Sequence, residues 1–137
     1  MNLQMATRHA LFAVLELASR PDEQLSALDI ADRYDISANH LAKVLRVLGR
    51  AGIVEAVRGV GGGYRFVGKA KRLSLMDIVS LFEPIGSPDH STAPGARTPQ
   101  GQALRLVMTE IEDTARSTLS SITVETMLKL AGRMDAP

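Results

Sequence analysis

The chain has 137 residues, of which 45% are hydrophobic and 23% charged, and a net charge of +1. These values are typical of a globular protein with one domain, or one domain plus an association element. The absence of cysteine excludes disulfides, thiolate chemistry and cysteine-bound zinc or iron–sulfur centres. No apolar run approaches the roughly 20 residues that span a bilayer, and the first twenty residues show helical periodicity where a signal peptide would have a cleavage site. We therefore expect a cytoplasmic protein with no membrane partner.

The positive charge is concentrated in the middle of the sequence. Residues 37–72 carry eight basic side chains and one acidic side chain, Glu55, whereas residues 1–36 and 73–137 each have a net charge of −3. Such a block is typical of a surface that contacts a polyanion, because each neutralised phosphate releases counterions. A solvated basic face without a partner is the alternative. The positions of these charges on the predicted elements favour the first interpretation.

The first fifty residues predict three helices. An apolar stripe indicates the first of them, over residues 7–20, and consists of Leu11, Val14, Leu15 and Ala18. The second is short and starts at Ser26 and Asp29, a pair that resembles a capping box; we expect it to bury Ile30 and Ala31. A four-residue turn at 34–37 leads to the third helix, for which Ser37 is the expected N-cap. Two short helices joined so tightly, the second of them basic, predict a helix-turn-helix.

The third helix has the features of a recognition helix. Its predicted core stripe is Leu41, Val44, Leu45 and Leu48, and Gly52 is placed to end it. Five polar side chains lie off this stripe, and the first three sit in the opening turns, where a recognition helix meets base edges. These five residues are Asn39, His40, Lys43, Arg46 and Arg50.

A glycine-rich hairpin is predicted to follow. Residues 53–57 and 64–67 indicate two strands, joined by a turn that contains four glycines. A glycine loop that cradles nucleotide phosphates would require a Lys-Ser/Thr pair opening a helix, whereas a Tyr-Arg-Phe strand follows here. The loop is therefore interpreted as a wing, with Arg58 and Arg65 at its base directed at a phosphate or a minor groove. Tyr64 is expected to support the hairpin by packing across the strands rather than to stack on sugar.

After the hairpin, the sequence predicts a short helix, then a loop, and then two further helices. The short helix is expected to start at Ser74, to bury Leu75, Ile78, Val79 and Phe82, and to stop before Pro84. Residues 86–97 indicate a loop, after which Thr98 and Pro99 open a long helix that runs to about residue 119. Thr123 is expected to cap a final short helix that packs through Val124, Met127, Leu128 and Leu130 and frays over 132–137.

The long helix carries its own apolar stripe, close to a heptad seam. A helix of this kind needs another surface to bury, and we expect a second copy of the chain to supply it; folding back on its own domain is the alternative. The expected dimerisation residues are Leu104, Val107, Met108, Ile111, Ala115 and Leu119.

Together these elements predict a mainly α fold with a small β-hairpin. The expected organisation is a winged helix-turn-helix domain over residues 1–83, a loop over 84–97, and a dimerisation helix with a short terminal helix over 98–137.

Three segments carry a resemblance to a known family: the run Thr7-Arg8-His9-Ala10-Leu11, the helix ISANHLAKVLRVLGRAGIV and the wing RGVGGGYRF. They resemble the Rrf2-type bacterial regulators, strongly over about residues 1–83, and the layout of the C-terminal half is similar. The resemblance implies a homodimeric winged-helix DNA-binding protein that acts at partly palindromic operators. Some members bind an iron–sulfur cluster through three cysteines, which would fall near Ser91, Arg97 and Ala103 here, and some add a ligand where this chain has Arg8. Since none of these four residues offers a thiolate, we expect no cofactor.

We accordingly predict a sequence-specific transcription regulator that acts as a homodimeric repressor; the resemblance itself implies a protein that represses or activates promoters. The partners expected are double-stranded DNA, a second copy of the chain and an unidentified small-molecule effector bound by the loop and the long helix. The residues expected at DNA are Ser37, Asn39, His40, Lys43, Arg46, Arg50, Arg58, Gly59, Val60, Gly61 and Arg65. The alternative is a winged-helix module whose basic face binds an acidic protein. No catalytic constellation indicates an enzyme, and the scattered His9, His40 and His90 do not indicate a metal site.

Overall fold

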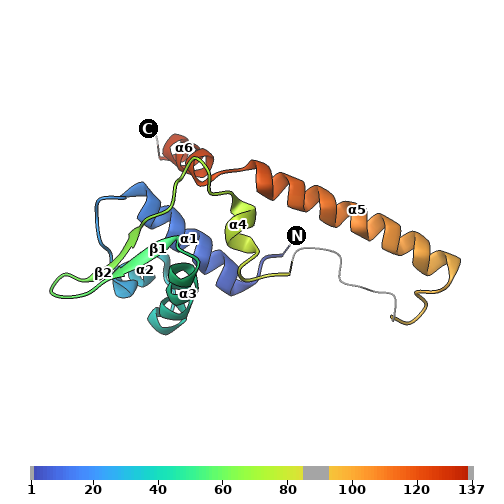
Figure 1. The fold of residues 1–137 in the computed structure, drawn as a ribbon, viewed down its shortest axis with the longest axis horizontal. Helices are drawn as coiled ribbons and strands as arrows, with labels where there is room; N and C mark the ends of the chain where they lie inside the picture. The colour runs from blue at the N-terminus through green and yellow to red at the C-terminus, as the bar shows by residue number, and fades with distance from the viewer. Residues whose placement is uncertain (1, 85–92, 136–137) are drawn as a thin grey trace.

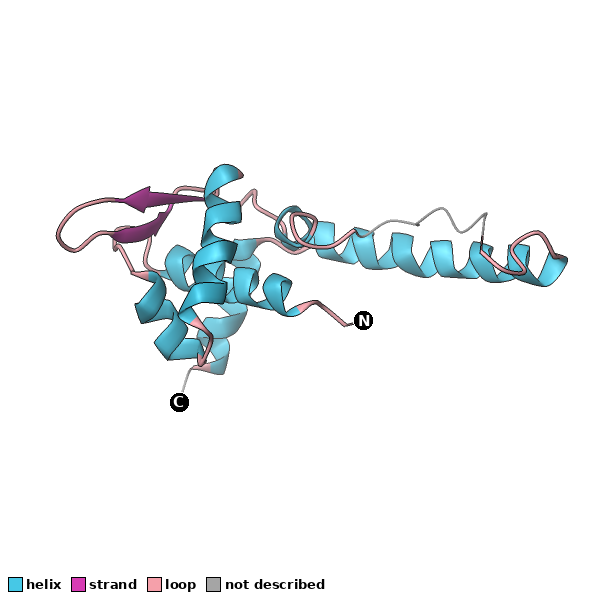
Figure 2. Cartoon of the chain, turned by 90° about the horizontal axis from the view of Figure 1, so that it is seen from below, coloured by secondary structure: helices cyan, strands magenta, loops and turns pink. Residues whose placement is uncertain are grey.

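The computed structural model describes residues 2–84 and 93–135 of the chain. Within these ranges there are six helices and one hairpin (Figure 1), which confirms the predicted mainly α fold. The elements in chain order are α1 (Met5–Ser19), α2 (Ala27–Tyr34), α3 (Ala38–Arg50), β1 (Val54–Val57), β2 (Gly63–Phe66), α4 (Leu75–Val79), α5 (Pro99–Ser121) and α6 (Val124–Met134). In Figures 1 and 2, α5 extends away from a body made of the other elements.

The core lies where α1 and α3 pack against each other, with α2 and the hairpin at the sides. The predicted stripe of α3 is buried throughout, and each fully buried leucine contributes about 1.5–3 kcal/mol. In α1 the buried face differs from the predicted stripe, because Ala10, Ala13 and Leu17 are fully buried whereas Leu11 and Leu15 are half-buried. The small side chains Ala10 and Ala13 allow α1 to pass close to its neighbours.

The helix caps follow the sequence. Ser26 and Ser74 each form a complete capping box, in which their hydroxyls accept from the backbone N–H of Asp29 and Asp77 at 3.0 and 3.1 Å. Thr98 and Thr123 cap α5 and α6 as predicted. The end of α3 is a Schellman motif: Gly52, with φ +77°, donates to the carbonyl of Gly49, and Ile53 donates to that of Leu48.

The hairpin is antiparallel. Strand β1 begins one residue later than predicted, and strand β2 begins and ends one residue earlier than predicted. Its register pairs Val54 with Phe66 and Glu55 with Arg65. An isolated antiparallel β-bridge, absent from the prediction, joins Leu25 to Tyr64 through two backbone hydrogen bonds of 2.9 and 2.7 Å. Tyr64 is half-buried and packs against the core.

Two predictions in the last third of the chain are wrong in part. Helix α4 ends at Val79, whose carbonyl accepts from the N–H groups of both Phe82 and Glu83; Phe82 therefore packs on the core from a turn. Helix α6 continues through Gly132 to Met134 instead of fraying. Leu130 is 42% exposed because α6 faces the core through Val124 and Leu128, one turn apart, and position 130 lies on another side of the helix.

Part of the predicted loop lies outside the described residues, including His90 and Ser91. Within the described ranges, each helix is too short or too polar to cross a bilayer.

Candidate nucleic-acid interface

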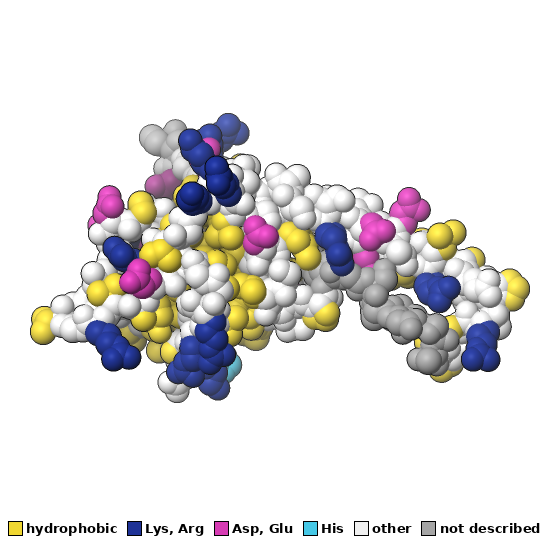
Figure 3. Space-filling view, viewed as in Figure 1, with side chains coloured by type: hydrophobic (Ala, Val, Ile, Leu, Met, Phe, Trp, Pro, Cys, Tyr) yellow, Lys and Arg dark blue, Asp and Glu magenta, His cyan; other side chains and the backbone are white. Residues whose placement is uncertain are grey.

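Helix α3 exposes a polar face opposite its buried stripe. All five predicted contact residues of this helix, Asn39 to Arg50, are exposed, as is the cap Ser37. Ser37 accepts from the N–H of His40 at 3.4 Å, which fixes the start of the helix. Among the described residues, no carboxylate forms an ion pair with Lys43, Arg46 or Arg50. Their basic side chains gather below α3 in Figure 3, where the helix is open to a partner.

A buried carboxylate connects α1 to α2, which precedes α3. Glu16 is only 5% exposed and forms ion pairs with Arg33 at 2.8 Å and Arg20 at 2.9 Å. It also accepts from the hydroxyl of Tyr34 at 2.7 Å, and burial together with this hydrogen bond raises the pKa of Tyr34. The Tyr34 ring stacks on Phe12 with centroids 4.8 Å apart. These contacts fix α2 against α1, and Asp35, with φ +54°, then turns the chain into α3.

The two arginines of the wing differ in their surroundings. Arg58 is exposed and has no ion-pair partner among the residues described, and the nearby Val60 at the tip is fully exposed. Arg65, in contrast, forms an ion pair of 3.1 Å with Glu55 directly across the strands. The sequence predicts the same phosphate contact for both arginines. In the structure, the ion pair of Arg65 competes with such a contact, whereas Arg58 has no competing ion pair among the described residues.

His9 lies behind the recognition helix and was not among the predicted contacts. It is 9% exposed, and burial lowers its pKa, with further lowering by the charges of His40 and Arg8. No pattern in the sequence predicts this burial beyond the place of His9 in the first helix.

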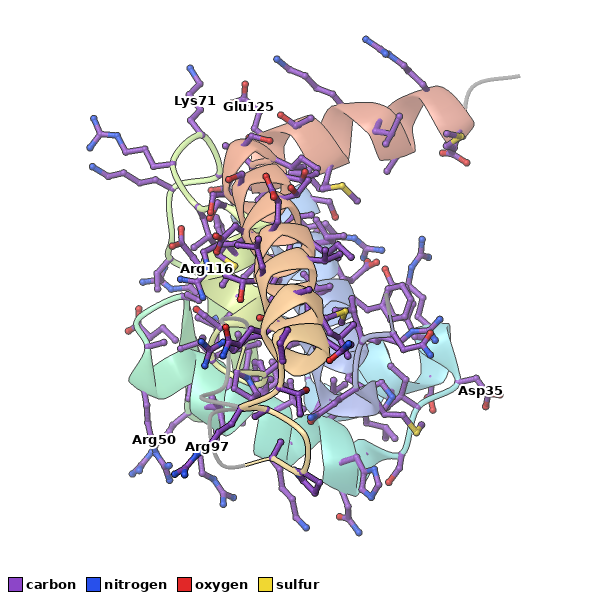
Figure 4. The ribbon with its side chains drawn as sticks, turned by 90° about the vertical axis from the view of Figure 1, so that its right-hand side faces the viewer. Asp35, Arg50, Lys71, Arg97, Arg116 and Glu125 are labelled. Atoms are coloured by element: carbon purple, nitrogen blue, oxygen red, sulfur yellow. The ribbon has the colours of Figure 1, made fainter. Side chains whose placement is uncertain are left out.

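The basic block of residues 37–72 does not form one surface, contrary to the interpretation from the sequence. Lys69, Lys71 and Arg72 lie in the turn between β2 and α4, and this turn is attached to α6 by a hydrogen bond of 3.0 Å from Glu125 N–H to the carbonyl of Ala70. In Figure 4, Lys71 and Arg50 lie on opposite sides of the molecule. The surface around α3 therefore carries only part of the positive charge.

Helix α5 leaves much of its apolar stripe open. Leu104, Val107, Met108 and Ile111 are between 43% and 63% exposed, and no residue of the helix is buried. Ala115 and Leu119 are half-buried within the chain, where this end of α5 meets α4. The expected stripe is thus divided between an exposed part and a part already in contact with its own chain.

A hollow of about 430 Å³ lies between the start of α5 and the turn before it. Its walls include Leu104, Arg105 and Met108, so that it adjoins the exposed part of the stripe.

Known proteins are similar to this chain in both sequence and fold. The profile of the Rrf2 family, described as iron-dependent transcriptional regulator, matches residues 3–130. The HTH-type transcriptional regulator BadM of Rhodopseudomonas palustris is 52% identical over 130 residues, covering 95% of this chain and 83% of BadM. IscR of T. potens superposes with a TM-score of 0.82 at 25% identity, over 100% of this chain and 93% of that one. CymR of B. subtilis, described as the global cysteine regulator, gives 0.80 at 26% identity, over 95% and 98% of the two chains.

The family description implies iron, and the donor set of this chain does not fit a thiolate-bound cluster. The sequence has no cysteine, and Arg97 and Ala103 stand at two of the positions where a cluster ligand is expected. Within the described ranges, no group of three or more histidine or carboxylate side chains is arranged to hold a metal ion.

Proposed function

Because the chain belongs to the Rrf2 family of winged-helix transcriptional regulators, we propose that it binds double-stranded DNA as a homodimer and represses transcription at partly palindromic operators. The observation that carries the proposal is the polar face of α3, which holds Lys43, Arg46 and Arg50 exposed and without ion pairs among the described residues. The name of BadM as an HTH-type regulator supports it.

Each part of the interface has its own role in this proposal. Ser37, Asn39, His40 and Lys43 enter the major groove, where amide and amine groups can read base edges. Arg46 and Arg50, further along α3, contact the backbone. The wing reaches the flanking minor groove through Arg58, Gly59, Val60 and Gly61, with Arg65 behind them at the base of the hairpin. Since Arg65 already pairs with Glu55, it contributes less to binding than Arg58.

The homodimer forms through the exposed stripe of α5. The exposed stripe is too large an apolar surface to remain in contact with water along one helix; it consists of Leu104, Val107, Met108 and Ile111. A second copy offers a matching stripe. Ala115 and Leu119 extend the stripe towards the body of the chain. Two-fold symmetry then places two copies of α3 on half-sites separated by about 34–36 Å or a multiple of it.

A salt titration of an Arg58→Ala variant tests the wing contact. We expect weaker binding, and a slope of log K against log salt that is smaller by about 1, because the variant neutralises one phosphate fewer. Arg105→Ala on α5 is the matched control and keeps the slope of the unmodified protein. An unchanged slope for Arg58→Ala would contradict the wing contact.

The alternative, a basic face that binds an acidic protein, makes a different prediction. It requires that the chain show no preference for any DNA sequence over competitor DNA at moderate salt. The expected small-molecule effector also remains a prediction, and the hollow beside Leu104 and Met108 supports it, since an occupant there would touch the dimer-forming stripe. A bound effector would raise the melting temperature and change DNA affinity.

A further inference from the structure

A second basic surface lies on the side of the molecule opposite α3. It combines the turn between β2 and α4 with one side of α6, and Figures 3 and 4 show its basic side chains above these two elements. Its members are Lys69, Lys71, Arg72, Lys129 and Arg133, all of them exposed.

The turn is held rigid by α6. The N–H groups of Arg72 and Leu73 both donate to the carbonyl of Lys69 at 2.9 Å, which closes the turn on itself. The carbonyls of Ala70 and Leu73 accept from the N–H groups of Glu125 and Val124 at 3.0 and 2.8 Å. The first turn of α6 thus satisfies two of its free backbone donors with this turn, so the basic side chains project from a fixed frame.

Little of this charge is neutralised nearby. Glu125 pairs with Lys129 at 3.1 Å, four residues along the same side of α6. Arg133 lies four residues further on that side, about 6 Å along the axis. No ion pair joins Lys69, Lys71, Arg72 or Arg133 to any carboxylate of residues 2–84 and 93–135. Like charges held together repel one another unless an anionic partner binds.

We propose that this second basic surface binds the sugar–phosphate backbone of DNA without sequence preference. The proposal does not require the α3 interface, because the two surfaces lie on opposite sides of the molecule (Figure 4). Lysine and arginine on a turn and on the side of a helix can neutralise phosphates, which carry one charge per about 1.7 Å of duplex, but they offer no element that enters a groove. A straight duplex bound to α3 cannot reach this surface, which therefore contacts a separate or strongly bent segment.

Substitutions at each surface, alone and together, test the proposal. One variant, K43Q/R46Q/R50Q, removes the charges of α3, and the other, K69Q/K71Q/R72Q, removes those of the turn. Binding to a 30-base-pair duplex of random sequence is measured by fluorescence anisotropy between about 50 and 200 mM salt, a range over which phosphate contacts lose most of their contribution.

The expected result is that the α3 variant still binds the duplex, and that adding the turn substitutions weakens this remaining binding at least tenfold. The salt slope falls by about 0.9 for each phosphate that is no longer neutralised. Glu125→Gln in the α3 variant should act in the opposite direction and strengthen binding, because it removes the one acidic side chain paired within the surface.

Remaining binding that does not respond to the turn substitutions would overturn the proposal, as would an α3 variant that binds no duplex at all. Failure of the proposed function gives a different pattern. In that case the α3 variant would bind as tightly as the unmodified protein, and the turn variant alone would lose DNA. Circular dichroism of each variant verifies that the fold is retained, since all six substituted side chains are exposed.

Discussion

His9 connects the stability of the chain to pH. Burial lowers its pKa below the usual 6.5, and the charges of His40 and Arg8 lower it further. The unfolded chain therefore binds a proton at higher pH than the folded chain, and stability must fall as pH decreases from about 7 through 6.5. The melting temperature of the unmodified protein should accordingly drop between pH 7 and pH 5.

A His9→Gln variant isolates this contribution, since glutamine does not titrate. Its melting temperature should fall less over the same interval, so that the two curves converge or cross towards pH 5. His40→Gln, at an exposed position, serves as the control and should leave most of the pH dependence in place. Parallel curves for His9→Gln and the unmodified protein would contradict the assigned cause.

At the residue scale, the sequence predicts exposed side chains better than buried polar ones. The predicted contact residues of α3 are exposed because their spacing alone places them off the core stripe. Glu16 gave no such signal, since its partner Arg33 comes from the next helix and only the packing of α1 on α2 brings the two together. Glu55 likewise meets Arg65 through the strand register, which the glycine turn does not specify in advance.

At the scale of elements, the starts of α2 to α6 were predictable because a Ser or Thr cap and its partner lie three residues apart. Helix α1 lacks such a cap, and it begins at Met5 rather than at the predicted residue 7. The β-bridge between Leu25 and Tyr64 was not predictable, since the two residues lie far apart in the sequence and Leu25 has no strand pattern around it. The division of the basic block into two surfaces was unpredictable for the same reason. The turn at 69–73 follows the wing in sequence, but backbone hydrogen bonds attach it to α6.

Gly63 is required where the backbone of Leu25 approaches β2. A Cβ there would lie 2.5 Å from the carbonyl oxygen of Leu25, so Gly63→Ala must push Leu25 and β2 apart. We expect a loss of about 1–3 kcal/mol in the free energy of unfolding, with faster hydrogen exchange at the Leu25 and Tyr64 amides.

Gly61→Ala, in the turn that precedes β2, is the matched control. Gly61 has φ +76° but open space around the Cβ position, so alanine costs about 1–2 kcal/mol of backbone strain without touching Leu25. Exchange at Leu25 and Tyr64 should then stay slow. Equal exchange rates in the two variants would show that the strand contact does not depend on Gly63.

At the scale of the whole molecule, the proposed dimer depends on one side of α5. Ile111→Glu places a charge in the exposed stripe and should convert a dimer of twice 14.7 kDa into a monomer. Leu106 is 70% exposed but lies two residues from Leu104 and Met108, on the other side of the helix. Leu106→Glu should therefore remain dimeric, and light scattering distinguishes the two. A dimeric Ile111→Glu protein would place the interface elsewhere.

The central claim is that two copies of the α3 face read a two-fold symmetric DNA site. Selection of bound duplexes from a random pool, followed by measurement of the mass of the complex, tests it most directly. The account predicts an enriched inverted repeat whose half-sites lie about one helical turn or a multiple apart, bound by two chains. A pool without any enriched sequence, or a single half-site bound by one chain, would contradict it.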